Sequence, residues 1–238
     1  MTISSHILVL IIGLIYPAYF LFTYKKTNNQ IKNDGNYRLV NYKHTIFIFW
    51  LLTWLVIGNA FIDKSIPLNL YPTFNTTGIV LAALILIFIG LQIITSKVST
   101  MDKAESIIEK MKDNYQYLPK SKREFIWFNL LSLSAGICEE IIFRLFMFSY
   151  LLENTNLIIA FILTNVIFAL THIGSGKQNI LGAFILGLLF TAIYYFTSNI
   201  WLSVILHSAI DISAGVLGYF AHKFEMKTTN EISEDWNS

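Results

Sequence analysis

The feature that most constrains this chain is a series of long apolar segments, each close to the length that crosses a lipid bilayer. A hydrocarbon core of about 30 Å requires roughly 20 apolar residues in helical form. Hydrophobic residues make up 55% of the chain and charged residues only 13%, whereas about a quarter of a soluble domain is charged. One water-soluble core cannot bury that much apolar surface. The composition therefore excludes a soluble globular domain and a disordered chain, and predicts an all-α polytopic membrane protein.

Seven segments meet or nearly meet this length, and polar turns separate the last four. The turn signals lie at residues 153–156, 174–177 and 197–199, where polar residues and glycine interrupt the apolar runs. We therefore predict a transmembrane bundle of about seven spans, over residues 5–24, 45–62, 78–96, 125–152, 157–173, 179–197 and 200–221.

Lysine and arginine are concentrated in alternate loops, which sets the expected orientation. The first, third and fifth loops and the segment after the last span hold nearly all of them, whereas the intervening loops hold only Lys64. The positive-inside rule then places the N-terminus outside and the C-terminus in the cytoplasm. The basic loop residues are Lys25, Lys26, Lys32, Arg38, Lys43, Lys97, Lys103, Lys110, Lys112, Lys120, Lys122, Arg123, Lys177, Lys223 and Lys227.

The chain divides into three parts that we expect to form one integrated membrane domain. Residues 1–119 hold three apolar spans and a short cytoplasmic helix, residues 120–221 hold the last four spans, and residues 222–238 form a polar cytoplasmic tail. The short helix is indicated by apolar residues that recur at helical spacing between residues 101 and 112. It is typical both of an amphipathic helix on the inner membrane surface and of a solvated connector.

Net charge and cysteine content narrow the function further. The formal net charge of +2 is too small to indicate a nucleic-acid partner, so the lipid bilayer is the expected environment. The single cysteine, Cys138, excludes an internal disulfide, and in an apolar helix it is most simply a small buried hydrophobe. The composition, rich in Ile, Asn and Lys, favours a bacterial cytoplasmic membrane protein.

Ionisable residues inside the predicted spans are confined to the C-terminal four. Charges at bilayer depth are costly, so they usually face a polar cavity and have partners. The first three spans carry none in their interiors, which makes the N-terminal part apolar and requires the C-terminal part to enclose a polar site. The residues concerned are Glu139, Glu140, Arg144, His172, His207 and Asp211.

The spacing of the acidic residues in the fourth span indicates two different roles. Glu140 precedes Arg144 by four residues, the favourable order for an ion pair on one helix face. A buried arginine stays charged and needs such a carboxylate. Glu139 points about 100° away around the helix. We therefore interpret Glu140–Arg144 as a structural pair and Glu139 as the carboxylate available for chemistry.

The two remaining pairs also share helix faces. His207 and Asp211 are four residues apart, so Asp211 could orient the His207 ring, or both could bind one substrate oxygen or one metal. Phe168 and His172 have the same spacing, and Asn165 lies on the same face about two turns from His172. Three helices that each present such a pair predict one shared site.

These residues form three motifs in a fixed order. Residues 139–144 match EExxxR, residues 168–172 match FxxxH, and residues 207–211 match HxxxN/D. The chain thereby resembles the CAAX-protease and bacteriocin-processing family, also called CPBP or Abi, of intramembrane endopeptidases. The resemblance covers about residues 120–221, and residues 1–119 share only their apolar character.

The resemblance implies hydrolysis of a peptide bond within the membrane. In prenyl-protein endopeptidases of this family, the positions of Glu139 and His172 activate the attacking water. The positions of His207 and Asp211 stabilise the oxyanion, and Glu140 and Arg144 complete the first motif. The family pattern has Asn at the last position, where this chain has Asp211. Because a carboxylate donates a hydrogen bond only when protonated, we expect Asp211 to orient His207 instead.

No cofactor is expected, although zinc is a chemically reasonable alternative. Glu139, His172 and His207 are the residue types of a three-ligand catalytic zinc site, but the HExxH motif is absent. The chemistry otherwise needs only a base beside a water and a donor for developing negative charge.

Depth in the membrane is the main geometric difficulty. Counting the rise per residue places Glu139 and His207 near mid-membrane, whereas His172 lies near the cytoplasmic end of its span. We expect helix tilt, or a helix break near the small residues 134–136, to bring them together. The site should then lie nearer the cytoplasmic leaflet.

Two other functions are compatible with the sequence. Family members include non-catalytic membrane partners, such as bacteriocin-immunity factors or scaffolds that regulate a sensor or cell-envelope protein. Buried Glu, His and Asp also serve proton- or ion-coupled transport, but no repeated pair of broken helices supports that reading. The leading hypothesis is an endopeptidase that acts on a membrane-presented peptide or protein, whether prenylated or not.

Overall fold

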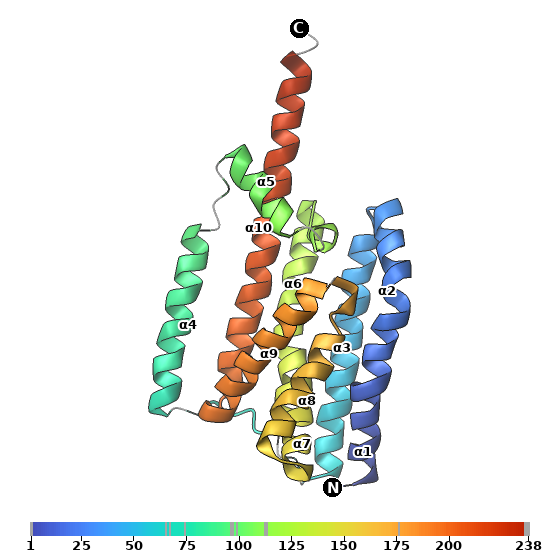
Figure 1. Cartoon of the computed structure of the whole chain (residues 1–238), viewed down its shortest axis with the longest axis vertical. Helices are drawn as coiled ribbons and strands as arrows, with labels where there is room; N and C mark the ends of the chain where they lie inside the picture. Colours follow the sequence, from blue (N-terminus) through green and yellow to red (C-terminus); the bar gives the residue numbers. More distant parts are fainter. Residues whose placement is uncertain are drawn as a thin grey trace.

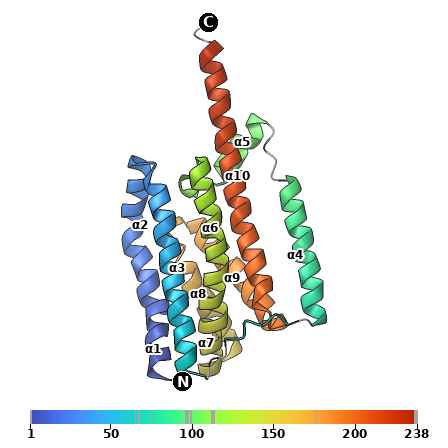
Figure 2. The same cartoon turned by 180° about the vertical axis from the view of Figure 1, so that it is seen from behind.

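The computed structural model describes residues 2–64, 66, 68–73, 75–95, 98, 100–111, 114–175 and 177–235, with backbone alone at 175, 177, 178 and 228–235. Over these residues the protein is helical and contains no strand (Figure 1, Figure 2). In chain order the elements are α1 (Ile3–Leu10), the π-helix η1 (Ile11–Ile15), α2 (Tyr16–Asn33), α3 (Tyr37–Ile62), α4 (Thr76–Thr95), α5 (Met101–Lys110), the 3₁₀ turn η2 (Tyr115–Tyr117), α6 (Lys122–Glu139), the π-helix η3 (Glu140–Phe148), α7 (Ser149–Asn154), α8 (Leu157–Leu170), the 3₁₀ turn η4 (Ile173–Ser175), α9 (Lys177–Thr197) and α10 (Ile200–Asp235).

The helices confirm that the protein is polytopic, but they do not confirm the predicted number of seven crossings. Five described helices are long and apolar enough to cross a membrane, and each contains or nearly coincides with a predicted span. The predicted span at 125–152 corresponds to the continuous run α6–η3–α7, and that at 157–173 corresponds to α8, an apolar helix of 14 residues. Seven crossings and the orientation of the termini stay predictions. The five helices are Ile3–Asn33, Tyr37–Ile62, Thr76–Thr95, Asn179–Thr197 and Ile200–Lys227.

The segments predicted to be cytoplasmic lie at one end of the bundle. The turn between α2 and α3, helix α5, the start of α6 and the C-terminal end of α10 are together at the top of Figure 1, and the N-terminus is at the opposite end. Helix α4 lies at the edge of the bundle and packs on α9 and α10. This arrangement fits the alternation of basic loops.

The small residues of α6 allow close helix packing and do not form the helix break that we considered as an alternative to helix tilt. Residues 134–136 lie inside the continuous helix α6. A Cβ atom on Gly136 would lie 2.1 Å from Ser208 Oγ and 3.0 Å from the Ser208 backbone nitrogen. Helices α6 and α10 therefore touch almost backbone to backbone. The helix changes character only at Glu140, where η3 begins.

Helix α8 ends inside the bundle, which reduces the difference in depth expected between His172 and the residues Glu139 and His207. Its 14 residues span about 21 Å, less than the hydrocarbon thickness. The connection from α8 to α9 accordingly lies partway along the bundle, below the end where α2 meets α3 (Figure 1). This turn packs against α2, where Gly174 approaches the Tyr24 Cβ atom. His172 is therefore deeper than a full-length span would place it.

The helix predicted to be cytoplasmic packs on α10, and the predicted polar tail continues α10. Helix α5 begins at Thr100, whose side chain accepts a hydrogen bond from the Lys103 backbone, and it packs on α10 with Ala104 fully buried. The segment predicted as a tail continues α10 as helix to Asp235. Lys97 and Lys112, two of the basic residues used for orientation, lie outside the described residues.

The contact between α6 and α10 predicts a steric effect at one glycine. Gly136→Ala should destabilise the folded protein by about 1–3 kcal/mol, because the added methyl group meets backbone as well as the Ser208 side chain. Thermal unfolding in detergent would measure it. Gly58→Ala and Gly182→Ala are matched controls, since a Cβ meets nothing within 4 Å at either position. A Gly136→Ala protein as stable as these controls would contradict the close approach.

Candidate active site

The site is built from one long helical run whose character changes at Glu140. Ser121 and Glu124 form a capping box that starts α6, and the α-helix ends at Glu139. The next nine residues are π-helical, a conformation that frequently marks functional sites. Glu139, Glu140 and Arg144 lie at this junction, and all three are buried.

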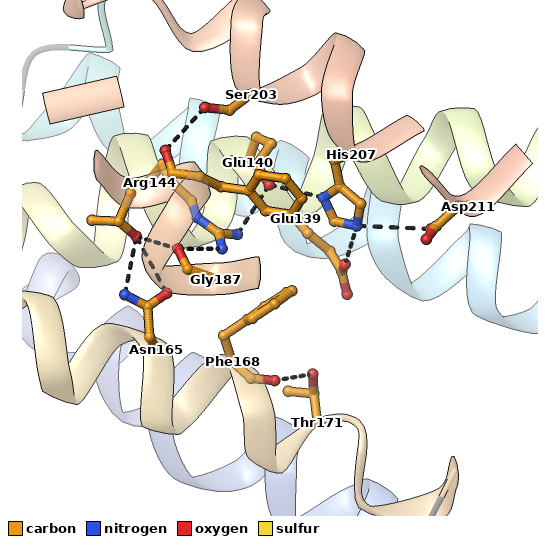
Figure 3. Close-up of polar contacts among 12 residues, drawn as sticks. Glu139, Glu140, Arg144, Asn165, Phe168, Thr171, Gly187, Ser203, His207 and Asp211 are labelled. Atoms are coloured by element: carbon orange, nitrogen blue, oxygen red, sulfur yellow. Dashed lines mark hydrogen bonds and ion pairs between the residues drawn. The ribbon is translucent and has the colours of Figure 1, made fainter. Parts of the chain in front are cut away.

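A single carboxylate oxygen connects the arginine to one of the histidines. Oε1 of Glu140 accepts a hydrogen bond from Arg144 Nη1 at 3.0 Å and lies 2.8 Å from His207 Nδ1 (Figure 3). Because a carboxylate accepts, Nδ1 of His207 carries the proton. The predicted Glu140–Arg144 ion pair is present, with both side chains fully buried. The contact between Glu140 and His207, residues far apart in the sequence, was not predicted.

Aromatic rings and a backbone carbonyl complete the surroundings of Arg144. Its guanidinium carbon lies 4.4 Å from the Phe168 ring centroid and 5.3 Å from that of Phe190. Nη2 donates to the Gly187 carbonyl at 3.3 Å. A Cβ on Gly187 would lie 3.3 Å from this same Nη2 and 2.5 Å from Asn165 Oδ1. Phe168 is the first residue of the FxxxH motif, whereas Phe190 belongs to none of the motifs.

The other ring nitrogen of His207 faces two more carboxylates. Nε2 lies 3.5 Å from Glu139 Oε2 and 3.7 Å from Asp211 Oδ2 (Figure 3). The Phe190 ring stacks on the imidazole, with centroids 4.8 Å apart and planes 16° from parallel. We expected Asp211 to orient His207, but the hydrogen-bonded partner is Glu140, and Asp211 stands at the longer distance. The orientation of the ring is therefore set mainly by Glu140 and Phe190.

His172 is held by the turn that ends α8. Its Nδ1 lies 3.1 Å from the Phe168 carbonyl and 3.1 Å from Thr171 Oγ1, and its ring meets the Phe168 ring edge-on at 4.8 Å. Since a carbonyl only accepts, Nδ1 carries the proton, and Nε2 of the neutral ring is left as an acceptor. No hydrogen bond to Nε2 is present among the residues that the structure describes.

A cavity of about 410 Å³ joins the predicted residues. Glu139, His172 and Asp211 all line it, while His207 lies against Glu139 and Asp211. Cys138, immediately before Glu139, is fully buried and is not part of the cavity wall. The wall opposite the motifs comes from α2 and α3 and is rich in tyrosine, including Tyr16, Tyr19, Tyr24, Tyr37 and Tyr42.

The connector before α6 covers one side of this cavity. The Tyr117 hydroxyl donates to Asn28 Oδ1 and, at 3.2 Å, to the Gly174 carbonyl, so it joins α2 to the turn that carries His172. Burial raises the pKa of Tyr117 to about 12, which keeps this donor protonated. Arg38 of α3 donates from Nη1 to the Gln116 carbonyl of the connector at 3.1 Å, and its ion pair with Glu124, at 3.3 Å, joins α3 to the start of α6.

The described residues do not assemble a metal site of the kind considered from the sequence. No group of three or more His, Cys, Asp or Glu side chains among them is placed to hold a metal ion. His207 is close to Glu139, but its other short contact is to Glu140, the partner of Arg144. The three-ligand set of Glu139, His172 and His207 therefore does not fit this arrangement.

Fold and site together define a helical membrane protein with a buried carboxylate–histidine centre. Residues 121–213 match the model of a family described as type II CAAX prenyl endopeptidase Rce1-like. The match confirms the resemblance inferred from the motifs, over the segment that contains all three of them. No curated protein and no solved structure matches the chain.

The shared carboxylate predicts a structural role for Arg144. Arg144→Ala should lower the amount of folded protein, because it leaves Glu140 buried without its cation, a loss of about 3–5 kcal/mol for a broken buried pair. Size-exclusion chromatography of the solubilised protein would measure it. Arg123→Ala, at an exposed position of the same helical run, is the matched control. Normal yield and stability of Arg144→Ala would contradict the assignment.

Proposed function

We propose that this protein is an intramembrane endopeptidase that hydrolyses a peptide bond of a membrane-presented peptide or protein. The observation that carries the proposal is that Glu139, His172 and Asp211 line one cavity inside the bundle, with His207 in contact with Glu139. The match to an endopeptidase family over the segment that contains all four residues supports it.

In the proposed mechanism, Glu139 and His172 activate a water molecule. His172 Nε2 is available to accept a hydrogen bond from the water, because Nδ1 is engaged by the Phe168 carbonyl. Glu139 takes a proton from the water as its oxygen attacks the carbonyl carbon of the peptide bond. When the C–N bond breaks, the same proton passes to the leaving nitrogen. The products are a carboxylic acid and an amine, and Glu139 returns to its ionised form.

His207 and Asp211 are proposed to act on the charge that develops during this attack. Glu140 and Phe190 fix the His207 ring so that Nε2 faces Glu139 and Asp211. A protonated ring in this position would offer an N–H group to the reacting carbonyl, and Asp211 would help to hold that proton. Glu140 and Arg144 act as the support of this arrangement.

The proposed topology places the cavity toward the cytoplasm of a bacterial cell. Its wall includes residues near the α2–α3 end of the bundle, which carries the basic loops. The described lining residues include many tyrosines and neither lysine nor arginine. Such a wall suits an apolar or neutral segment of the substrate, with or without an attached lipid. No metal ion takes part in the proposed reaction.

The proposal predicts that one isosteric change abolishes function. Glu139→Gln removes the base but keeps the side-chain volume, so cleavage should fall at least about 100-fold at unchanged protein abundance. A deletion strain complemented by each variant would test it, with new peptide and protein ends compared by mass spectrometry. Glu153→Gln, an exposed position in α7, is the matched control.

The same experiment separates the protease from a non-catalytic partner. If Glu139→Gln complements fully and leaves every protein end unchanged, the chain acts as an immunity factor or a regulatory scaffold, and the search turns to the protein that it binds. Uptake that depends on a proton gradient would instead indicate a transporter.

Removal of metal ions provides an independent prediction. Cleavage by the purified protein, with a peptide that spans the cleavage site found above, should persist in 1,10-phenanthroline at the level seen with the non-chelating 1,7 isomer. The reason is that Glu139 and His172 alone supply the base and the water contact in the proposed reaction. Loss of cleavage that added Zn²⁺ restores would establish the zinc alternative and refute the metal-free mechanism.

A further inference from the structure

The turn that carries His172 lies within the bundle and receives a hydrogen bond from a distant segment. Helix α8 ends at Leu170, and the 3₁₀ turn Ile173–Ser175 follows almost directly. Buried carbonyl groups in such a turn need donors from elsewhere in the chain. The Gly174 carbonyl, two residues after His172, accepts from the Tyr117 hydroxyl at 3.2 Å, across 57 residues of sequence. The connector before α6 therefore contacts the backbone beside a proposed site residue.

The backbone around Tyr117 is itself fixed by two helices. The Tyr117 carbonyl accepts a hydrogen bond from the Tyr42 hydroxyl of α3, and the Gln116 carbonyl accepts from Arg38 of the same helix at 3.1 Å. On the other side, Leu118 is buried and packs closely against α10. The Tyr117 hydroxyl is thus carried by a rigid support, which a residue that positions another group requires.

The same hydroxyl also contacts α2. A Cβ on Gly174 would lie 3.1 Å from the Tyr24 Cβ atom, so the turn packs directly on α2. The Tyr117 hydroxyl donates to Asn28 Oδ1, four residues further along that helix. One hydroxyl therefore has two acceptors, one on α2 and one on the turn, and a single proton to share between them. Removal of the hydroxyl and removal of the α2 acceptor should consequently have different effects.

The proposed chemistry depends on where this turn lies. The contact of His172 Nδ1 with the Phe168 carbonyl fixes the tautomer of the ring, but both groups belong to one short segment. They move together if that segment shifts relative to Glu139, which is carried by α6. A misplacement of about 1 Å can lower a rate about 100-fold. A hydrogen bond from outside the segment opposes such a shift.

We propose that Tyr117 is a positioning residue, whose hydroxyl holds the Gly174 carbonyl and thereby sets the position of His172 relative to Glu139. The inference rests on the proposed endopeptidase function. Tyr117 keeps its proton throughout, and no covalent bond to it forms or breaks. It lies outside the family match at residues 121–213. The connector then contributes to catalysis through a motif residue without belonging to a motif.

Two other roles of the hydroxyl make different predictions. Tyr117 also lines the cavity, so a hydroxyl that contacted the substrate in the ground state would act on KM rather than on kcat. A hydroxyl that only joined α2 to the connector would depend on Asn28 as much as on Tyr117. The positioning role predicts the opposite for Asn28→Ala, because the hydroxyl can then give its proton to the Gly174 carbonyl alone.

The test compares Tyr117→Phe, Asn28→Ala, Tyr115→Phe and Glu139→Gln with the wild type as full-length purified proteins. The probe is the peptide that spans the cleavage site whose products disappear in the Glu139→Gln strain. Tyr117→Phe should lower kcat by about 10- to 100-fold, with little change in KM. Asn28→Ala should retain the wild-type kcat.

Tyr115→Phe is the matched control. Tyr115 belongs to the same 3₁₀ turn η2 as Tyr117, and its hydroxyl contacts His222 and Glu225 of α10, each at 3.3 Å. Tyr115 is not among the described residues that line the cavity. Both Tyr→Phe changes remove one hydrogen-bonded hydroxyl, so they should lower the thermal midpoint by similar amounts. Only Tyr117→Phe should change kcat.

The outcomes distinguish this inference from the proposed function. A wild-type kcat in Tyr117→Phe, beside an inactive Glu139→Gln protein, would overturn the positioning role alone. A change confined to KM, an equal loss of kcat in Asn28→Ala or Tyr115→Phe, or a thermal midpoint of Tyr117→Phe far below that of Tyr115→Phe would also overturn it. Wild-type cell products from the Glu139→Gln strain would overturn the endopeptidase and with it the role of Tyr117.

Discussion

The arrangement of this site depends on one carboxylate oxygen in the dry interior of the bundle. Glu140 Oε1 contacts both Arg144 and His207, so three ionisable side chains from two distant segments are fixed by one atom. A buried arginine is tolerated because this carboxylate, two aromatic rings and the Gly187 carbonyl replace its hydration shell. The same contact fixes His207 so that its other nitrogen faces Glu139. Glu140 therefore both stabilises the buried Arg144 and positions a residue of the proposed reaction.

Departures from regular transmembrane helices bring the cavity residues to one depth. Helix α8 ends within the bundle, so His172 lies on an internal turn rather than at a membrane surface. The π-helices η1 and η3 adjoin Tyr16 and Glu139. A bundle of seven full-length α-helices would hold the same side chains at different heights. The N-terminal helices are part of this arrangement, because α2 and α3 form the tyrosine-rich wall that faces the motif residues.

Motif spacing predicted pairs within a helix better than contacts between helices. The Glu140–Arg144 pair and the contact of Phe168 with His172 were both predictable, because residues four apart on a helix face are neighbours. The contact of Glu140 with His207 was not, and Asp211 was given the orienting role that Glu140 mainly holds. A helix break at the small residues of α6 was one of two ways expected to align the site residues, whereas these residues allow close contact with Ser208 of α10. Both contacts involve a partner on another helix, which the spacing of residues along one helix does not reveal.

The sequence by itself determined that this is a helical membrane protein, where its helices approximately lie, and which segment carries the buried ionisable residues. These features depend on apolar length and helical spacing, which are local properties. Only the tertiary structure decided which groups meet: the shared oxygen of Glu140, the ring of Phe190 on His207, and the Tyr117 hydroxyl on the turn that carries His172. These contacts depend on helix depth, rotation and close packing. Such properties are set jointly by residues far apart in the chain, and no window of sequence contains them.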